Sequence, residues 1–268
     1  MQFSASFRRY FATRAPQCSP FRFTQPPNPS WQLGQGAHKE FLEKSGDVPK
    51  KTWIMNETNP KDTYKLLTTC IVPRPIAFVS TLATDGTPNL APFSYFSMVS
   101  HNPPLLSISF SLSPRRPKDT RENILNTKQF TVNIISEEFA EAANITSVES
   151  PASNDEWKLS GLTMEPSTEV KPAMVKESHI SMECELNFAH DVTDLTTSQI
   201  TNTLVLGLIK RVHVRESVLN EDGSQVNPTA LNPLARLGGL SYATLGDGFD
   251  IARPSWKAVR EEIKGKDQ

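Results

Sequence analysis

Three stretches that lie close together in the chain carry most of the information about its fold. They read Ile71-Val-Pro-Arg-Pro-Ile-Ala-Phe-Val-Ser-Thr-Leu82, Asn89-Leu-Ala-Pro-Phe-Ser-Tyr-Phe-Ser97 and Ser107-Ile-Ser-Phe-Ser-Leu-Ser-Pro-Arg-Arg-Pro-Lys-Asp-Thr-Arg-Glu-Asn-Ile124. Their apolar runs, rich in β-branched and aromatic residues, predict strands over 76–82, 89–99 and 105–112. The third stretch then becomes basic and polar, and we expect a helix to begin there with Asp119 as its N-cap and Glu122 three residues later. A strand therefore leads into a helix through a short basic corner.

The rest of the chain adds more strands and few helices. Further strands are expected over 130–135, 180–188, 203–214 and 242–245, and a helix over 137–148. In 180–188 apolar and polar side chains alternate strictly, so one face of this strand should be buried and the other wet or at an interface. Residues 149–178 are rich in Pro and Ser and should be irregular. Hairpin-linked strands with few helices indicate a mainly β (α+β) protein, an antiparallel barrel with a few packed helices.

The amino-terminal segment differs in composition from the rest of the chain. Residues 1–39 contain no Asp or Glu but include five of the 28 Lys and Arg residues, and Phe3, Phe7 and Phe11 recur at helical spacing. An amphipathic, Arg-rich and acid-free start is typical of a mitochondrial targeting segment. The alternative is a disordered basic tail, with the protein cytoplasmic. We therefore expect a targeting or disordered segment over 1–39, a linker over 40–63, a barrel domain over 64–245 and a carboxy-terminal extension over 246–268.

The composition also argues against several classes of protein. Beyond residue 39 the chain has 23 basic residues against 29 acidic ones, a charge opposite to that of a nucleic-acid binder. No apolar run approaches the roughly 18 residues that cross a membrane. The histidines and cysteines show no metal-binding spacing, so no metal site is expected. The chain has neither a GxGxxG motif after its first strand nor a GxxxxGK[ST] motif.

The basic corner has the composition of a phosphate site. A helix N-terminus offers free N–H groups and a partial positive charge to an anion. Arg115, Arg116 and Lys118 add charge there, and Ser113 and Thr120 add hydroxyl donors. Upstream, the small Ala91 and Ser94 would let a flat ring approach the backbone, with Phe93, Tyr95 and Phe96 as walls. The alternatives are a solvated loop with ordinary helix capping, and aromatic residues that only fill a barrel core.

The motifs taken together resemble those of a known family. Arg74-Pro-Ile-Ala-Phe-Val-Ser-Thr81, Asp85-Gly86, Asn89-Leu-Ala-Pro-Phe-Ser94, Asn102-Pro-Pro104, Lys118-Asp-Thr120 and Asn123-Ile124 occur in order with close spacing. This series is similar to that of the flavin reductase-like, FMN-binding split-barrel family, in its flavoredoxin-like branch. The resemblance covers about residues 64–245 and includes Arg236-Leu-Gly-Gly-Leu-Ser-Tyr242.

The resemblance implies a six-stranded antiparallel split barrel that binds FMN at a homodimer interface. Carried over by position, residues 89–94 would contact the flavin ring, and Ser80 and Thr81 would lie near the ribityl chain or the ring edge. The phosphate would be held by serines of the third strand together with the corner, and residues 236–242 would close the site. The implied cofactor-binding residues are Ser80, Thr81, Asn89, Leu90, Ala91, Pro92, Phe93, Ser94, Ser109, Ser111, Arg115, Arg116, Lys118, Thr120 and Tyr242. No catalytic side chain is expected, because the flavin carries the chemistry.

The implied function is a flavin reductase that passes hydride from NAD(P)H to bound flavin, with an oxygenase or a reductase as a possible partner. The alternative is a non-catalytic FMN electron carrier that a partner reduces, and a third possibility is an empty barrel that serves as a structural dimer. One departure bears on this choice. Family reductases often carry Asp-His-Thr before the late glycine-bearing strand, with the His tied to nicotinamide handling, whereas this chain has Thr201-Asn202-Thr203.

Overall fold

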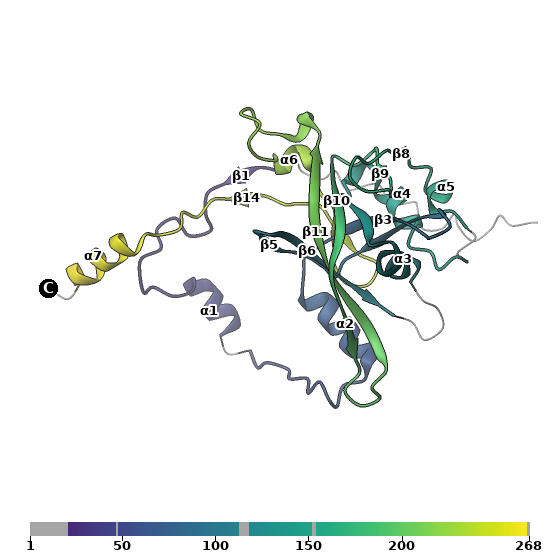
Figure 1. The fold of residues 1–268 in the computed structure, drawn as a ribbon. Helices are drawn as coiled ribbons and strands as arrows, with labels where there is room; N and C mark the ends of the chain where they lie inside the picture. The colour runs from purple at the N-terminus through teal and green to yellow at the C-terminus, as the bar shows by residue number, and fades with distance from the viewer. Residues whose placement is uncertain (1–20, 47, 113–117, 152–153, 267–268) are drawn as a thin grey trace, which may run out of the picture. The chain divides into compact units, whose positions relative to one another are not determined.

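The computed structural model describes residues 21–266, except 47, 113–117 and 152–153. The chain forms two compact units (Figure 1). The larger one spans Asp47–Leu245 and holds nearly all the secondary structure. The smaller one joins the two ends of the chain. In it β1 (Phe23–Thr24) pairs in parallel with β14 (Gly248–Phe249). The same unit contains two helices, α1 (Lys39–Ser45) and α7 (Trp256–Lys266).

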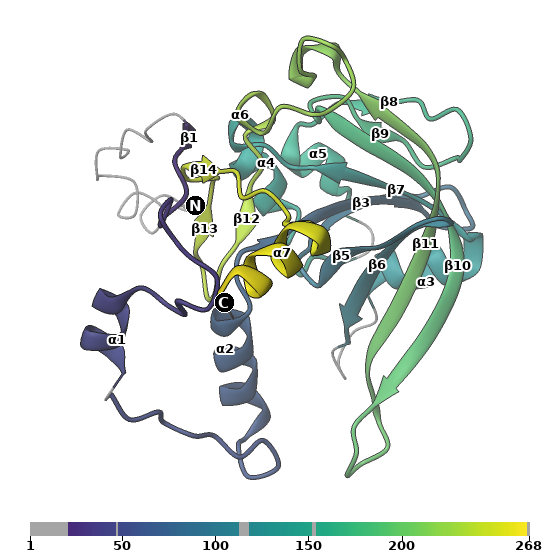
Figure 2. The same ribbon diagram turned by 90° about the vertical axis from the view of Figure 1, so that its left-hand side faces the viewer.

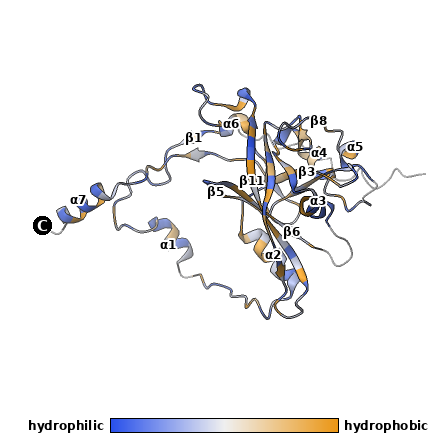
Figure 3. Ribbon diagram, viewed as in Figure 1, coloured by the Kyte–Doolittle hydropathy of each residue, from blue (hydrophilic) through white to orange (hydrophobic). Residues whose placement is uncertain are grey.

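The larger unit is built on one antiparallel sheet whose strand order is β4-β3-β7-β10-β11-β6-β5. Its strands are β3 (Ala77–Leu82), β4 (Pro88–Phe93), β5 (Phe96–His101), β6 (Pro104–Ser111), β7 (Gln129–Ile134), β10 (Ile180–Thr193) and β11 (Ile200–Val214). Figure 2 shows β10 and β11 extending together beyond the other strands. Hydrophobic and hydrophilic residues are interspersed along β11 (Figure 3), as expected for a strand with two different faces.

The two edges of this sheet are joined by a very short connection. β4 and β5 lie at opposite ends of the strand order, yet only Ser94 and Tyr95 separate them in the chain. The sheet must therefore curve until its edges meet, which makes a barrel that is open along this line. The Tyr95 carbonyl accepts from the Ser109 N–H at 2.9 Å and holds the bend against β6. Counted as one bent strand, β4 and β5 correspond to the single strand expected over 89–99. The seven strands of the sheet then count as six, and the expected six-stranded split barrel is confirmed.

Two hydrophobic cores lie on the two faces of β3. Ala77 and Val79 point into the barrel, where Phe110, Phe130 and Ile124 join them. Ile76 and Phe78 point outward, where short helices cover them: η2 (Glu137–Phe139), α4 (Ala140–Ile145) and α5 (Glu156–Ser160). Because both of its faces are buried, the first half of β3 is apolar and does not alternate, and the polar Ser80 and Thr81 that follow are buried as well.

The other elements border the open line of the barrel. Helix α2 (Pro60–Cys70) begins after Asn59, whose side chain accepts from the Asp62 N–H at 3.0 Å. It leads into β2 (Arg74–Pro75), which forms a small sheet with β12 (Ala235–Arg236) and β13 (Tyr242–Ala243). Helix α3 (Asp119–Thr127) follows the basic corner and contributes Ile124 to the barrel core. A hairpin of β8 (Met164–Glu165) and β9 (Met174–Val175), the turn η3 (Glu216–Val218) and helix α6 (Pro228–Leu231) complete the unit.

Several local expectations were wrong. The N-cap of α3 is Lys118 and not Asp119, and the Lys118 side chain makes no cap hydrogen bond. The helix expected over 137–148 is divided into η2 and α4. The segment 149–178 is not wholly irregular, since it contains α5 and the β8–β9 hairpin.

The first part of the polar face of β10 is also buried, whereas this face was expected to be wet or at an interface. Glu183 is fully covered because residues 168–170 bond to it, and the buried Ser181 donates to Asn133 Oδ1 at 2.7 Å. The Glu183 carboxylate accepts from the backbone N–H groups of Thr168, Glu169 and Val170 and lies 2.6 Å from His213 Nε2. A carboxylate with this many partners is stable in a buried position that the sequence pattern assigned to solvent.

Within the described part of the chain, no helix is long and apolar enough to cross a membrane, and no group of His, Cys, Asp and Glu residues is placed to hold a metal ion.

Candidate functional site

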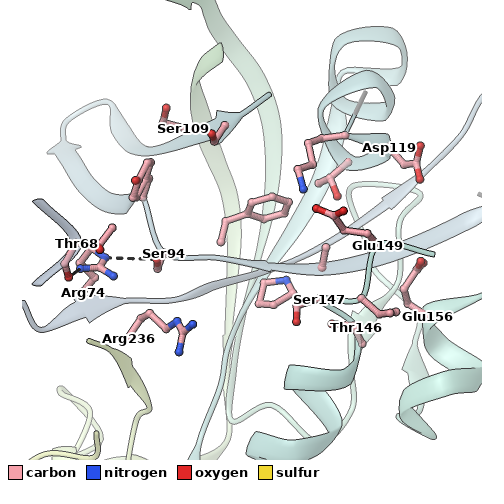
Figure 4. A pocket seen from close by; sticks show the side chains of 18 of the residues that line it. Thr68, Arg74, Ser94, Ser109, Asp119, Thr146, Ser147, Glu149, Glu156 and Arg236 are labelled. Carbon is pink, nitrogen blue, oxygen red and sulfur yellow. Dashed lines mark hydrogen bonds between the residues drawn. The ribbon is translucent and has the colours of Figure 1, made fainter. Parts of the chain in front are cut away.

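A cavity of about 490 Å³ lies where β4 bends into β5 and α3 begins (Figure 4). A volume of this size is in the range of pockets that bind cofactors. Its wall comes from five parts of the larger unit: α2 and β2, the β4–β5 bend, β6 with the start of α3, the segment that links α4 to α5, and the loop after β12. The lining residues used below are Thr68, Arg74, Asn89, Ala91, Pro92, Phe93, Ser94, Tyr95, Ser109, Ser111, Lys118, Asp119, Thr120, Glu149, Glu156 and Arg236.

The floor of the cavity is the second half of β4. Ala91 and Pro92 expose little side chain, so a flat ligand can approach the backbone there. Phe93 lines the wall and is held from behind by Phe110, with ring centroids 4.7 Å apart in an edge-on arrangement. The aromatic wall of the cavity is thus packed against the barrel core.

One end of the cavity is the strand-to-helix corner. Ser111, the last residue of β6, lines the cavity together with Lys118 and Thr120 from the start of α3, while Ser109 lines it beside Tyr95. Among the described residues, the N-cap residue Lys118 makes no side-chain cap hydrogen bond, so an anionic ligand beside its ammonium group could accept from the first-turn amides. This is the geometry expected of a phosphate site.

A buried polar network fixes the corner to the barrel. The Asn89 side-chain amide donates to Thr120 Oγ1 at 2.8 Å and to Thr81 Oγ1 at 3.2 Å. The Asn123 amide donates to the same Thr81 hydroxyl at 3.0 Å. These bonds join β3, β4 and α3, so the start of the helix keeps its place at the cavity wall.

Carboxylates also line this half of the cavity: Asp119, Glu149 and Glu156. Burial raises the pKa of Glu156, and the negative charge of Asp119 raises it further. A hydrogen bond from Ser150 to the Glu156 carboxylate acts in the opposite direction and lowers this pKa. A phosphate placed beside Lys118 would therefore favour protonated Glu156.

The opposite end carries two arginines. Arg74 donates to Ser94 Oγ at 3.4 Å and to the Thr68, Ile71 and Leu237 carbonyls. Arg236 donates to the Gly239 and Ser241 carbonyls, and its guanidinium lies 4.4 Å from the centre of the Tyr242 ring. Tyr95 also lies at this end. Burial raises the pKa of its hydroxyl and the nearby Tyr64 raises it further, whereas the positive charge of Arg74 lowers it.

The structure brings together most of the residues that the resemblance assigned to the cofactor. Those on the cavity wall are Asn89, Ala91, Pro92, Phe93, Ser94, Ser109, Ser111, Lys118 and Thr120. Arg115 and Arg116 lie outside the described residues.

Four of the assigned residues are not on the wall. Leu90 points to the second core, because it lies between Asn89 and Ala91 and strand side chains alternate between faces. Ser80 pairs with Leu90 in register and is buried. Thr81 is buried behind Asn89 and supports it. The Tyr242 hydroxyl donates to Asn144 Oδ1 at 2.7 Å, away from the cavity lining.

Other parts of the wall were missed. Arg74 belongs to the motif series but was given no role, and Glu149 and Glu156 lie in a segment that was expected to be irregular. No local pattern points to these residues, because packing of distant segments brings them to the cavity. Asn202, at the position of the family His, donates to Ser109 Oγ at 3.3 Å and so lies directly behind the wall.

The chain is thus a split barrel with a cavity at a strand-to-helix corner. The model of the flavin reductase like domain matches residues 69–235. The chain belongs to this family and is a flavin-binding oxidoreductase.

Similar proteins agree with this membership. Nitrilotriacetate monooxygenase component B from Bacillus cereus is 36% identical in sequence, with a TM-score of 0.72 over 76% of this chain and 100% of that one. The 2-nitrobenzoate 2-nitroreductase NbaA of Pseudomonas fluorescens is 28% identical, with a TM-score of 0.67 over 77% of this chain and 98% of that one. The uncharacterized protein YwrF of Bacillus subtilis is 36% identical over 200 residues, which are 75% of this chain and 97% of YwrF.

The comparisons correct the mitochondrial assignment. The relatives in Bacillus subtilis, Aquifex aeolicus and Halalkalibacterium halodurans are bacterial, and bacteria have no mitochondria. Targeting was inferred from the composition of residues 1–39, and basic, acid-free composition alone does not distinguish an import signal from any other basic segment. Residues 1–20 also lie outside the described part of the chain.

Proposed function

We propose that the flavin is FMN and that the protein reduces it with NAD(P)H. The observation that carries this proposal is the corner, where Lys118, the hydroxyls of Ser111 and Thr120 and the N-terminus of α3, which the Lys118 side chain does not cap, line the cavity. A terminal phosphate distinguishes FMN from riboflavin, and such a corner suits a phosphate monoester.

The residues on the wall fit the cofactor in two ways. Lys118 and the first-turn amides of α3 would hold the phosphate, while residues 91–94 would lie along the ring. When bound, the flavin supplies the hydride chemistry, so the protein needs to bind and orient it and to exclude water. No side chain is proposed as a general base.

The choice of electron donor depends on Asn202, which lies behind Ser109 in the cavity wall. Asn202 stands where family reductases often carry His, and it donates to Ser109 but cannot titrate near neutral pH. NAD(P)H is proposed as the donor because family reductases use it. The second candidate is an FMN electron carrier reduced by a partner protein, which the absence of the family His favours.

We also propose a homodimer that serves a partner oxygenase. The dimer is supported by β5, an edge strand on which Met98 and Val99 are exposed. An exposed apolar edge strand is commonly covered by another chain. The partner is suggested by the similar Bacillus cereus protein, which is named as a component of a monooxygenase.

The visible spectrum of the purified protein tests the cofactor, together with mass identification of whatever denaturation releases. A flavin spectrum and release of FMN are expected. Colourless protein that gains no thermal stability with added FMN would contradict the proposal and favour an empty structural barrel.

Anaerobic mixing with NADH or NADPH tests the activity. Rapid loss of the flavin absorbance is expected of the reductase. Flavin that stays oxidised with both donors, but is reduced by a separate reductase, would identify the protein as a carrier.

A further inference from the structure

Arg74 and Arg236 lie directly opposite each other in the small sheet. β2 pairs with β12 in antiparallel fashion, and the register places the Cα of Arg236 against that of Arg74. Opposite residues of an antiparallel pair project to the same face. Both side chains indeed line the same end of the cavity (Figure 4).

Neither arginine forms an ion pair with a described residue. The ion pairs found among the described residues include neither guanidinium. Their hydrogen bonds go to backbone carbonyls and to the Ser94 hydroxyl, which orient a guanidinium but leave its charge unbalanced. Arg74 is only 9% exposed, so solvent compensates it little. Like charges directly opposite each other destabilise a strand pair.

The two ends of the cavity differ in the charges that surround their cations. Lys118 shares its end with Asp119, Glu149 and Glu156, whereas among the described lining residues none beside the two arginines carries a carboxylate. An anionic group at the arginine end would therefore meet two positive charges without a competing negative one. Binding would also remove the repulsion between the guanidiniums.

We infer that Arg74 and Arg236 form an oxyanion site for the second ligand of the cavity, the molecule that exchanges electrons with the flavin. The group bound there is a carboxylate or a phosphate of that molecule. This inference rests on the proposed function only in placing the flavin phosphate at the Lys118 end. Arg74, held by four hydrogen bonds, is the fixed half of the site, and Arg236, bonded only to its own loop, is the half that can adjust to the ligand.

The test uses redox-inactive probes in pairs that differ mainly in charge. Benzoate with benzamide represents an aromatic carboxylate, and ADP with adenosine represents a nucleotide phosphate. Binding to the FMN-loaded protein is measured by the change in the flavin spectrum, and binding to the flavin-free protein by calorimetry. The variants are Arg236→Gln and Arg74→Lys, with Lys171→Gln, an exposed cation outside the cavity lining, as the control.

In the unsubstituted protein, the anion of at least one pair should bind about tenfold or more tightly than its neutral partner, because charge-assisted bonds are stronger than neutral ones. Arg236→Gln should remove this preference, and Lys171→Gln should keep it. Arg74→Lys retains the charge but loses the fork of donors, so it should reduce the preference. The pair that shows the preference identifies the source of the oxyanion.

Three results would overturn the inference. One is equal binding of both members of both pairs by the unsubstituted protein. Another is a preference that Arg236→Gln leaves intact although the variant is folded by circular dichroism. The third is an Arg236→Gln protein that loses affinity for FMN but not for riboflavin, because the arginines would then hold the flavin phosphate. Failure of FMN to bind at all would instead contradict the proposed function, and the flavin-free measurements would still decide the oxyanion site.

Discussion

At the corner where β6 leads into α3, the proposed function assigns the choice of flavin to single residues. Lys118 is the N-cap residue of α3 and lines the cavity, so its ammonium group and the amides of the first turn would form one anion site. The residue that an N-cap rule would choose, Asp119, is the first residue of the helix instead. With Lys118 as N-cap residue and no cap from its side chain, the first-turn amides would be open to the ligand of the proposed site.

Replacement of Lys118 with Gln should weaken FMN binding by about 10- to 100-fold, since a hydrogen bond to a charged group contributes about 1.5–3 kcal/mol. Riboflavin, which has no phosphate, should bind the variant and the unsubstituted protein equally. Fluorescence titration with both flavins measures the two affinities. Lys171→Gln is the matched control, and equal losses for FMN and riboflavin would place the phosphate elsewhere.

Glu183 should make the stability of the fold depend on acidity. Burial raises the pKa of this carboxyl, but the bonds from His213, Glu169 and Thr168 outweigh burial and lower the pKa to about 2 from its ordinary value of 4.5. A folded-state pKa below the unfolded one stabilises the fold fully above about pH 4.5. The contribution is lost as the pH falls towards 2.

Glu183→Gln should therefore unfold more easily at pH 6, by about 3 kcal/mol, since one pKa unit corresponds to about 1.4 kcal/mol. The difference from the unsubstituted protein should shrink as the pH falls from about 5 to 2. Urea unfolding across this range measures it. Glu185→Gln, on the same strand but partly exposed, is the control, and a pH-independent difference would mean that the carboxylate charge contributes nothing.

At the scale of elements, the β10–β11 hairpin holds the barrel and the helix corner together. β11 pairs with β6 over residues 202–208 and with β10 along nearly its whole length. Arg121 of α3 donates to Thr203 Oγ1 at 2.8 Å and pairs with Asp191 at 3.1 Å, one residue on each strand of the hairpin. The start of α3 is thus held on one side by the contacts of Arg121 with Thr203 and Asp191, and on the other by the bond from Asn89 to Thr120.

Gly207 on β11 is the point where the hairpin packs most tightly on the barrel core. A Cβ at this position would meet Phe130 Cζ well inside contact distance, and Leu106 Cδ1 at 3.2 Å. Phe130 is fully buried and cannot move aside. Gly207→Ala should therefore destabilise the protein by about 1–3 kcal/mol, as expected for overpacking.

Thermal or urea unfolding measures this cost. Gly246→Ala is the control, because no atom lies within 4 Å of a Cβ placed there. If both variants unfold alike, the core around Phe130 is looser than the structure shows.

At the scale of the whole molecule, the curvature of the sheet creates both the cavity and an exposed edge. Because β4 turns into β5 within two residues, β5 has a sheet neighbour, β6, on one side only. Met98, on this strand, is 70% exposed. The proposed dimer would cover this edge with a second copy of the chain.

Light scattering should accordingly give about twice the 29.8 kDa mass of one chain. Met98→Glu should shift the protein towards monomers, because a buried, unpaired carboxylate disfavours association. Met164→Glu makes the same change at another exposed methionine and should leave the dimer intact. A monomeric unsubstituted protein, or a dimer unaffected by Met98→Glu, would place the interface elsewhere or remove it.

The sequence by itself determined the strands, the mainly β class and the position of the basic corner. These features depend on local patterns: apolar runs such as 76–82 and the change from strand to helix after residue 112. Periodicity, turn residues and capping signals act over a few residues, so they can be read in order along the chain. The motif series then pointed to the floor of the cavity and to most of its polar wall.

Only the tertiary structure decided which side chains from distant parts of the chain lie against each other. Arg74 and Arg236 are far apart in the chain and meet through the register of two short strands. Glu183 looks like a solvent-facing residue in the alternating pattern, yet a distant loop buries it. Leu90 and Asn89 are neighbours in one motif but belong to opposite faces. Register, curvature and the packing of remote segments determine these contacts, and a local pattern carries no information about segments that approach only when the chain folds.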